Sequence, residues 1–127
     1  MRYLLDTHTF IWFVSGNKEL SSKARKAIEA DNAINLISIA SIWEMAIKYS
    51  MDRLELSTTF QKLADQITEN DFAILPISFN DVLMLSSLPF HHRDPFDRMI
   101  IAQGLANSLT IISKDKSFSE YNTSLIW

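Results

Sequence analysis

The sequence predicts an α/β fold: a single three-layer α/β/α domain over residues 1–127 with a central, mainly parallel sheet. Short apolar runs alternate with longer stretches whose apolar residues recur at helical spacing, an order typical of a parallel sheet covered by helices on both faces. The chain has 127 residues, a usual length for one hydrophobic core. Hydrophobic residues make up 47% of it and charged residues 21%, as in ordinary globular domains.

The predicted strands are short apolar runs that stop at polar or turn-forming residues. The run from Tyr3 to Leu5 stops at Asp6, which indicates a short buried strand. Pro76 weakens another strand near its end, because proline lacks the N–H that a strand ladder needs. The remaining predicted strands are 33–37, 72–77, 109–112 and an edge-like strand over 121–127.

The predicted helices carry apolar stripes and begin at capping residues. Between residues 39 and 49 the apolar side chains fall three and four positions apart, which places them on one helical face. Asp94 followed by Pro95 is a strong helix start, because proline fits the first helical position. The predicted helices are 9–14, a helix that runs from a cap at Ser21 or Ser22 to about Ala30, 39–49, 57–70, 79–88 and 96–107.

The composition excludes several classes of protein. Without cysteine there is no disulfide scaffold, thiolate zinc site, iron–sulfur cluster or cysteine nucleophile. The two glycines, Gly16 and Gly104, lie in no glycine-rich phosphate loop, which excludes P-loop and Rossmann dinucleotide binding. The net charge of −3 gives no overall basic field for nucleic acid. No apolar run suits a signal peptide or a membrane span, so we expect a soluble, cytoplasmic protein that does not contact membranes.

Four acidic residues from separate segments are predicted to meet at one edge of the sheet. Asp6 directly follows the first predicted strand, and Asp115 follows the fourth. Ligands of such sheets bind beyond the carboxyl ends of the strands, near the point where the strand order reverses. Asp97 lies in the first turn of the helix before the fourth strand, and Glu44 in the second turn of the helix after the second strand. The acids therefore define the candidate site.

Structural roles remain open for each of these acids. Asp6 could cap the following helix, and the residue considered alone does not favour a functional role over this one. Residues 41–44 fit a capping box begun by Ser41, and Glu44 with Lys48 fits an exposed ion pair.

The later acids have similar alternatives. Asp94 is explained by helix capping, which we prefer for it. Asp97 could stabilise the positive end of the same helix, and Asp115 could be a turn residue between two lysines. None of these roles predicts that the acids share an edge.

The chemistry of such a cluster favours a divalent metal ion. Carboxylates held together repel one another, and a bound cation relieves that repulsion. Oxygen ligands without cysteine or histidine suit Mg²⁺, with Mn²⁺ as a second option, rather than Zn²⁺. A site of this kind can direct a water molecule in line at phosphorus.

The histidines offer a metal-free alternative. His91 and His92 could cleave RNA by acid–base catalysis through the 2′-hydroxyl. They precede a helix cap, so a loop or packing role is preferred. His8 either orients Asp6 or packs against Trp12, and no histidine is assigned to catalysis.

Five motifs occur in order from one end of the chain to the other. They are Leu4-Leu5-Asp6-Thr7-His8, Ser38-Ile39-Ala40-Ser41-Ile42-Trp43-Glu44, His92-Arg93-Asp94-Pro95-Phe96-Asp97-Arg98, Ile101-Ala102-Gln103 and Ser113-Lys114-Asp115. Together they resemble the PIN-domain ribonucleases, and most closely the VapC-like toxins of bacterial type II toxin–antitoxin pairs. The resemblance covers essentially the whole domain.

This resemblance implies a Mg²⁺-dependent endoribonuclease whose catalytic and metal-binding residues are Asp6, Glu44, Asp97 and Asp115. Asp97 begins the family pattern D-x-x-I-x-A, which continues through Ile100 and Ala102. The residues implied to support or orient these acids are Thr7, Ser41, Asp94 and Ser113.

The resemblance also implies a substrate and partners. The substrate would be a structured RNA such as tRNA or rRNA, the partner a VapB-like antitoxin, and the assembly a homodimer. Relatives often carry a Gly-Lys pair where this chain has Asp52 and Arg53, which puts the local turn or an RNA contact there in doubt. The candidates for RNA phosphate contacts beside the acids are Lys48, Arg93, Arg98, Lys114 and Lys116.

Two alternatives from other classes remain at this point. One is a metal-dependent phosphotransfer domain, either a response-regulator receiver or a haloacid-dehalogenase-like phosphatase. The segment Asp6-Thr7-His8 lacks the second aspartate of that phosphatase, and no adjacent acidic pair of a receiver precedes the first helix. The other alternative is a non-catalytic PIN-fold module that binds a protein, and the intact set of acids argues against it.

Overall fold

A computed structural model describes residues 1–54 and 59–127 and has the predicted three-layer α/β/α architecture. All strand pairs are parallel, and the five-stranded sheet has the order β3-β2-β1-β4-β5. The strands are β1 (Arg2–Leu5), β2 (Ile34–Ser38), β3 (Ala73–Leu75), β4 (Thr110–Ile112) and β5 (Leu125–Ile126). The helices are α1 (Thr7–Ser15), α2 (Ser22–Glu29), α3 (Ile39–Ser50), α4 (Phe60–Glu69), α5 (Phe79–Ser86), α6 (Pro95–Ala106) and the short 3₁₀ helix η1 (Lys116–Glu120).

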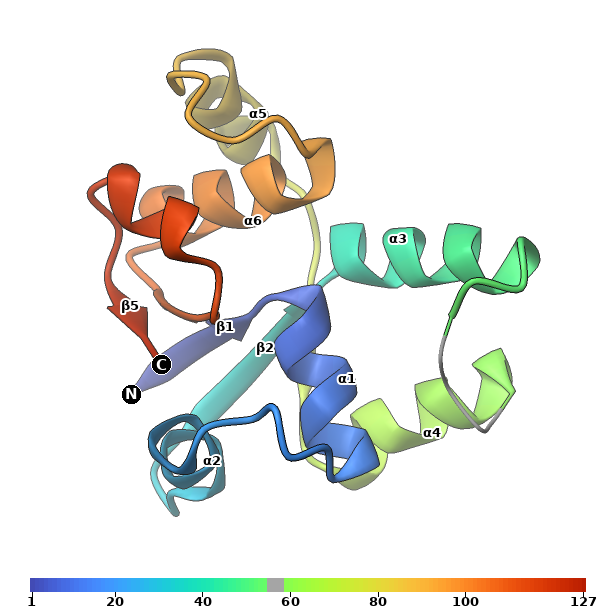
Figure 1. Ribbon diagram of the computed structural model, residues 1–127. Helices are drawn as coiled ribbons and strands as arrows, with labels where there is room; N and C mark the ends of the chain where they lie inside the picture. Colours follow the sequence, from blue (N-terminus) through green and yellow to red (C-terminus); the bar gives the residue numbers. More distant parts are fainter. Residues whose placement is uncertain (55–58) are drawn as a thin grey trace.

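The alternation of side chains along the central strands produces two cores, one on each face of the sheet. Leu4 of β1 packs with its register partners Leu36 and Ile111 and with α6. Its neighbour Leu5 belongs to the other core, together with Ile37 and side chains of α1, α2 and α4. Figure 1 shows α1, α2 and α4 on one side of the sheet and α5 and α6 on the other. Burial on both faces explains why these strands are continuously apolar.

The order of the strands determines where on the sheet the candidate site lies. The chain passes from β1 outward to β2 and β3, and then returns to pair β4 with the opposite side of β1. The reversal therefore lies between β1 and β4, whose carboxyl ends are adjacent. The Asp6 N–H donates to the Ile112 carbonyl across this junction at 3.2 Å. Ligands of such sheets bind beyond this point.

Capping residues begin the helices where the sequence predicts polar starts. Ser21 accepts from the Ala24 N–H at the start of α2, and Asp94 accepts from Phe96 and Asp97 at the start of α6. The predicted cap at Asp94 is thus confirmed. At α4 the cap is Thr59, and the predicted start at residue 57 lies outside the described residues.

The C-terminal region differs from the prediction. The strand predicted over 121–127 covers only Leu125–Ile126, and it is preceded by η1, which the sequence analysis missed. The fully buried Phe118 anchors η1 in the core, and the hydroxyl of Tyr121 donates to the Pro89 carbonyl at 2.8 Å. These tertiary contacts, rather than a local repeat of apolar residues, determine the backbone here.

Glycine at position 104 is required by close packing between α6 and β4. A Cβ atom there would lie 2.7 Å from Cδ1 of Ile111, well inside van der Waals contact. The absence of a side chain lets the helix approach the strand.

Among the described helices, none combines the length and the apolar character needed to cross a membrane.

Replacing Ser108 with glycine should stabilise the protein. Ser108 follows the C-cap of α6 with a φ of 53°, a left-handed conformation that glycine adopts without steric cost. We expect a gain of about 1 kcal/mol in the free energy of unfolding, measured by urea denaturation. The matched change Ser86→Gly, at the last residue of α5, should instead lower stability. A loss of stability in Ser108→Gly would contradict the prediction.

Candidate acidic site

A pocket at the carboxyl ends of β1 and β4 brings three of the four predicted acids together. Asp6, Asp97 and Asp115 line a cavity of about 360 Å³, along with His8, Trp12 and Lys114. The acids come from the end of β1, the first turn of α6 and the start of η1. The strand reversal therefore places them where the sequence analysis expected.

Asp6 is both a helix cap and a wall of this pocket. Its Oδ1 accepts from the Thr9 N–H at 2.8 Å, and its Oδ2 accepts from the Ser113 hydroxyl. The side chain is buried, with 5% of the residue exposed. Burial raises the pKa of Asp6 above its ordinary value, although the hydrogen bonds from Ser113 and Thr9 oppose this. The capping and functional interpretations are therefore compatible.

The pKa of Asp97 is raised well above its ordinary value. Burial is the largest cause, and together with the nearby charges of Asp94, Asp6 and, least, Glu44 it raises the pKa to about 7. The nearby imidazole of His92 acts in the opposite direction. The carboxyl thus ionises reluctantly because it is buried and other carboxylates lie close to it.

His92 lies between two of the acids, a placement that the sequence analysis missed. Its Nε2 is 3.1 Å from Oδ2 of Asp97 and 3.0 Å from Oδ2 of Asp115. Its Nδ1 accepts from the Asp94 N–H at 3.1 Å, so Nε2 carries a proton and donates to the carboxylates. The ring also packs edge-on against Phe118. The position of His92 two residues before the helix cap is the signal that could have indicated this contact.

Asp115 differs from the other acids in its charge state. Burial acts to raise its pKa, but hydrogen bonds from Ser117 and His92 outweigh it and hold the pKa below the ordinary value. Asp115 Oδ1 accepts from both the N–H and the hydroxyl of Ser117, which fixes the carboxylate at the start of η1. A carboxyl that ionises more readily than usual therefore lies in the same pocket as Asp97, which ionises less readily.

Glu44 lies behind the pocket and is connected to it through Thr7. The Thr7 hydroxyl donates to Oε1 of Glu44 at 2.6 Å and lies 2.9 Å from the Ser41 hydroxyl. Oε2 of Glu44 pairs with Lys48 at 3.2 Å. The predicted ion pair is present, but Glu44 itself is buried rather than exposed.

The capping box predicted at Ser41 is wrong. Ser38 caps α3, and its hydroxyl accepts from the Ala40 N–H at 3.0 Å, so Ser41 lies inside the helix. Ser41 and Glu44 therefore face Thr7 from within the helix.

The cations predicted to contact RNA phosphates differ in burial and in the pocket that they line. Arg98 does not suit RNA binding, because it is 6% exposed and its guanidinium donates to the carbonyls of Pro89 and Leu88. Lys114 lines the acidic pocket and pairs with Glu19 at 2.6 Å. Arg93 is exposed but lines a separate hollow, and Lys116 is exposed on η1.

The donor set fits a hard divalent cation. Asp6, Asp97 and Asp115 offer carboxylate oxygens in one pocket, and the mutual repulsion that raises the pKa of Asp97 is relieved by positive charge. His92 presents a proton rather than a lone pair, so the ligands left to a metal are oxygens. That combination favours Mg²⁺ or Mn²⁺ over Zn²⁺.

Comparison with known proteins gives one matching family model, the PIN domain, over residues 3–123. No curated protein matches the sequence. Among solved structures, VapBC2 from Rickettsia felis bound to a promoter DNA fragment matches with a TM-score of 0.73 and 15% identity, covering 99% of this chain and 98% of the other. A toxin–antitoxin complex from Klebsiella pneumoniae matches with a TM-score of 0.68 and 23% identity, covering 98% and 96%. VapBC-1 from nontypeable Haemophilus influenzae matches at 0.65 and 15%, covering 99% and 97%.

Replacing Asp97 with asparagine should stabilise the metal-free protein as pH rises. The pKa of Asp97 is about 7 in the folded protein, against an ordinary value of 3.8. The folded state therefore binds the proton more tightly than the unfolded state, and the free energy of unfolding falls as the pH rises from 3.8 to about 7. Asparagine removes this cost, and we expect a gain on the order of 2 kcal/mol at pH 8 that disappears near pH 4.

Urea unfolding in EDTA at both pH values measures the effect. Asp65→Asn, which removes an exposed carboxylate from α4, is the control and should give no such gain. An equal effect of Asp97→Asn at pH 4 and pH 8 would sink the prediction.

Proposed function

Because the chain belongs to the PIN domain family, we propose that it is a Mg²⁺-dependent endoribonuclease and the toxin of a type II toxin–antitoxin pair. The observation that carries the proposal is the pocket where Asp6, Asp97 and Asp115 converge at the strand reversal. We propose that the 127 residues act as one ribonuclease domain.

The acids would hold the ion, and neighbouring residues would keep them in place. Asp6, Asp97 and Asp115 are the proposed ligands, and Glu44 supports the site through its contact with Thr7. Ser113 and Thr9 orient Asp6, while Ser117 orients Asp115. A bound Mg²⁺ would stabilise negative charge at the phosphate and lower the pKa of a water molecule.

Cations around the pocket would receive the RNA backbone. Lys114 lines the pocket, Lys48 lies one helical turn from Glu44, and Lys116 and Arg93 are exposed nearby in the sequence. Such contacts offset the overall negative charge of the chain and act on phosphates rather than on base identity. From the resemblance to the VapC-like toxins, we propose a structured RNA, such as tRNA or rRNA, as the substrate class.

The proposed partners are a VapB-like antitoxin and a second copy of the chain. The matching structures include VapBC and toxin–antitoxin complexes, which supports an antitoxin partner. Two helices expose apolar side chains at helical spacing, as expected for a protein interface. These are Ile39, Trp43 and Ile47 on α3, and Phe79, Val82 and Leu83 on α5.

RNA cleavage should require Mg²⁺ and Asp97. The wild-type protein is expected to cleave labelled structured RNA with Mg²⁺, to lose activity in EDTA, and to regain it when Mg²⁺ is added in excess. Asp97→Asn should lower the rate by at least about 100-fold, because the substitution removes a proposed metal ligand. Asp65→Asn, on the exposed face of α4, should leave the rate unchanged.

The other outcomes of this assay identify the alternatives. Activity that survives EDTA would indicate metal-free catalysis by His91 and His92 and would contradict the metal site. Failure of the folded protein to cleave any RNA in a cellular pool would favour the non-catalytic interaction module.

A charged residue on α5 should disrupt the proposed homodimer. Leu83 is 51% exposed, and burying the lysine of Leu83→Lys in an apolar interface is costly. We expect the wild type to sediment as a dimer and the variant as a monomer at the same concentration. Ile34→Lys, at the opposite end of β2 from the acids, is the control and should remain dimeric. A monomeric wild type would contradict the proposed assembly.

A further inference from the structure

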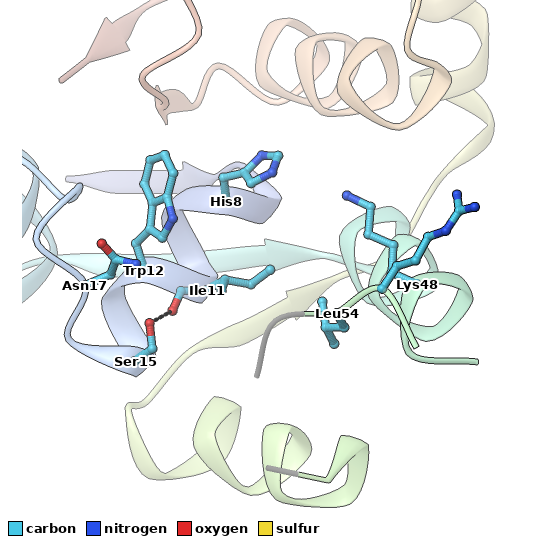
Figure 2. Close-up of a pocket in the computed structure, with 8 residues that line it drawn as sticks. His8, Ile11, Trp12, Ser15, Asn17, Lys48 and Leu54 are labelled. Atoms are coloured by element: carbon cyan, nitrogen blue, oxygen red, sulfur yellow. Dashed lines mark hydrogen bonds between the residues drawn. The ribbon is translucent and has the colours of Figure 1, made fainter. Parts of the chain in front are cut away.

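A second pocket adjoins the acidic one and shares two residues with it. This pocket has a volume of about 300 Å³, and His8 and Trp12 line both cavities. Figure 2 shows that its walls come from α1 on one side and from Lys48 and Leu54 on the other. The two pockets are therefore neighbours, with His8 and Trp12 at their boundary.

The wall from α1 presents flat aromatic surface. Trp12 and His8 lie one helical turn apart, and their ring centroids are 5.7 Å apart with a tilt of 39°. His8 is exposed and Trp12 is half-buried, so part of both rings is accessible from the pocket. Aromatic side chains of this kind stack on nucleobases, and the interaction tolerates any base because each has a flat face.

The opposite wall carries positive charge. Lys48 and the exposed Arg53 line the pocket, and its lining residues within the described part of the chain include no carboxylate. The ammonium of Lys48 pairs with Glu44 at 3.2 Å, which leaves it donors for another oxygen ligand. The guanidinium of Arg53 presents a planar set of donors that suits a phosphate. The charge of this pocket is thus opposite to that of the acidic one.

We propose that this second pocket is a binding subsite for the nucleotide next to the scissile phosphate, with its base on Trp12 and His8 and its phosphate at Arg53 and Lys48. The assignment rests on the proposed ribonuclease function and names the residues that would position the strand. A base in this pocket lies between the two walls and is unpaired. The same chain would then be held by metal and acids at one phosphate and by cations at the next.

Binding of a single strand to a variant impaired in cleavage tests the subsite directly. The parent is Asp97→Asn, and the probe is a short fluorescein-labelled single strand of 2′-O-methyl RNA, followed by fluorescence anisotropy over a range of salt concentrations. Arg53→Ala should weaken binding several-fold and lower the slope of log Kd against log salt by about 0.7, the value for one lost phosphate contact on a single strand.

Substitutions in the aromatic wall should lower the affinity without changing its salt dependence. Trp12→Leu should weaken binding by about 5- to 100-fold and leave the salt slope unchanged, because stacking releases no counterions. His8→Ala, at an exposed position that the fold does not need, should weaken binding with the same unchanged slope. Lys23→Ala, which removes an exposed charge on α2 outside both pockets, is the matched control and should bind like the parent.

The kinetics of otherwise wild-type protein separate this proposal from the proposed function. Arg53→Ala and His8→Ala should raise KM for RNA and leave kcat within a factor of two. If RNA is cleaved but these variants match Lys23→Ala in binding and KM, the subsite is wrong and the ribonuclease proposal stands. If the variants lose a protein partner but not RNA, the pocket belongs to that partner and the subsite is likewise overturned. If the wild type cleaves no RNA and the parent binds no RNA, both proposals fail.

Discussion

The repulsion between carboxylates that the fold holds together is the constraint on which the rest of the structure depends. Asp6, Asp97 and Asp115 come from three separate elements, and burial is nearly complete for Asp6, partial for Asp97 and least for Asp115. The protein tolerates this arrangement because hydrogen bonds and one imidazole satisfy the oxygens. Ser113 and Thr9 donate to Asp6, while His92 donates between Asp97 and Asp115. The site is therefore prepared for a cation by groups that cannot themselves replace it.

Strand pairing and helix packing around the site hold these groups in position. The pairing of β1 with β4 places the Asp6 N–H against the Ile112 carbonyl, and the Thr9 hydroxyl donates to that carbonyl at 3.0 Å. On the other side of β1, the strand β2 leads into α3, which carries Glu44 and Lys48 toward the same edge. Arg98, buried beneath the loop before α6, binds the carbonyls that shape this loop and so supports the position of His92. Stability and site geometry thus depend on the same contacts.

The sequence predicts the strands and helices well because their apolar periodicity is local. Leu4 and Leu5 on the central strand, the cap at Asp94 and the stripe on α3 each follow from neighbouring residues. The acids could be placed on one edge of the sheet because parallel strands end together. The role of His92 and the 3₁₀ helix after Asp115 could not, since both depend on contacts with Phe118 and Tyr121 that no periodicity encodes. Arg98 shows the same limit, because its burial is decided by a loop from another part of the chain.

The bond between Ser113 and Asp6 spans 107 positions of sequence. During synthesis the amino-terminal aspartate leaves the ribosome long before the strand that must lie beside it, so no partial chain can assemble the pocket. The site around Asp6 therefore stays incomplete until the segment that carries Ser113 and Asp115 has emerged and packed against the first strand.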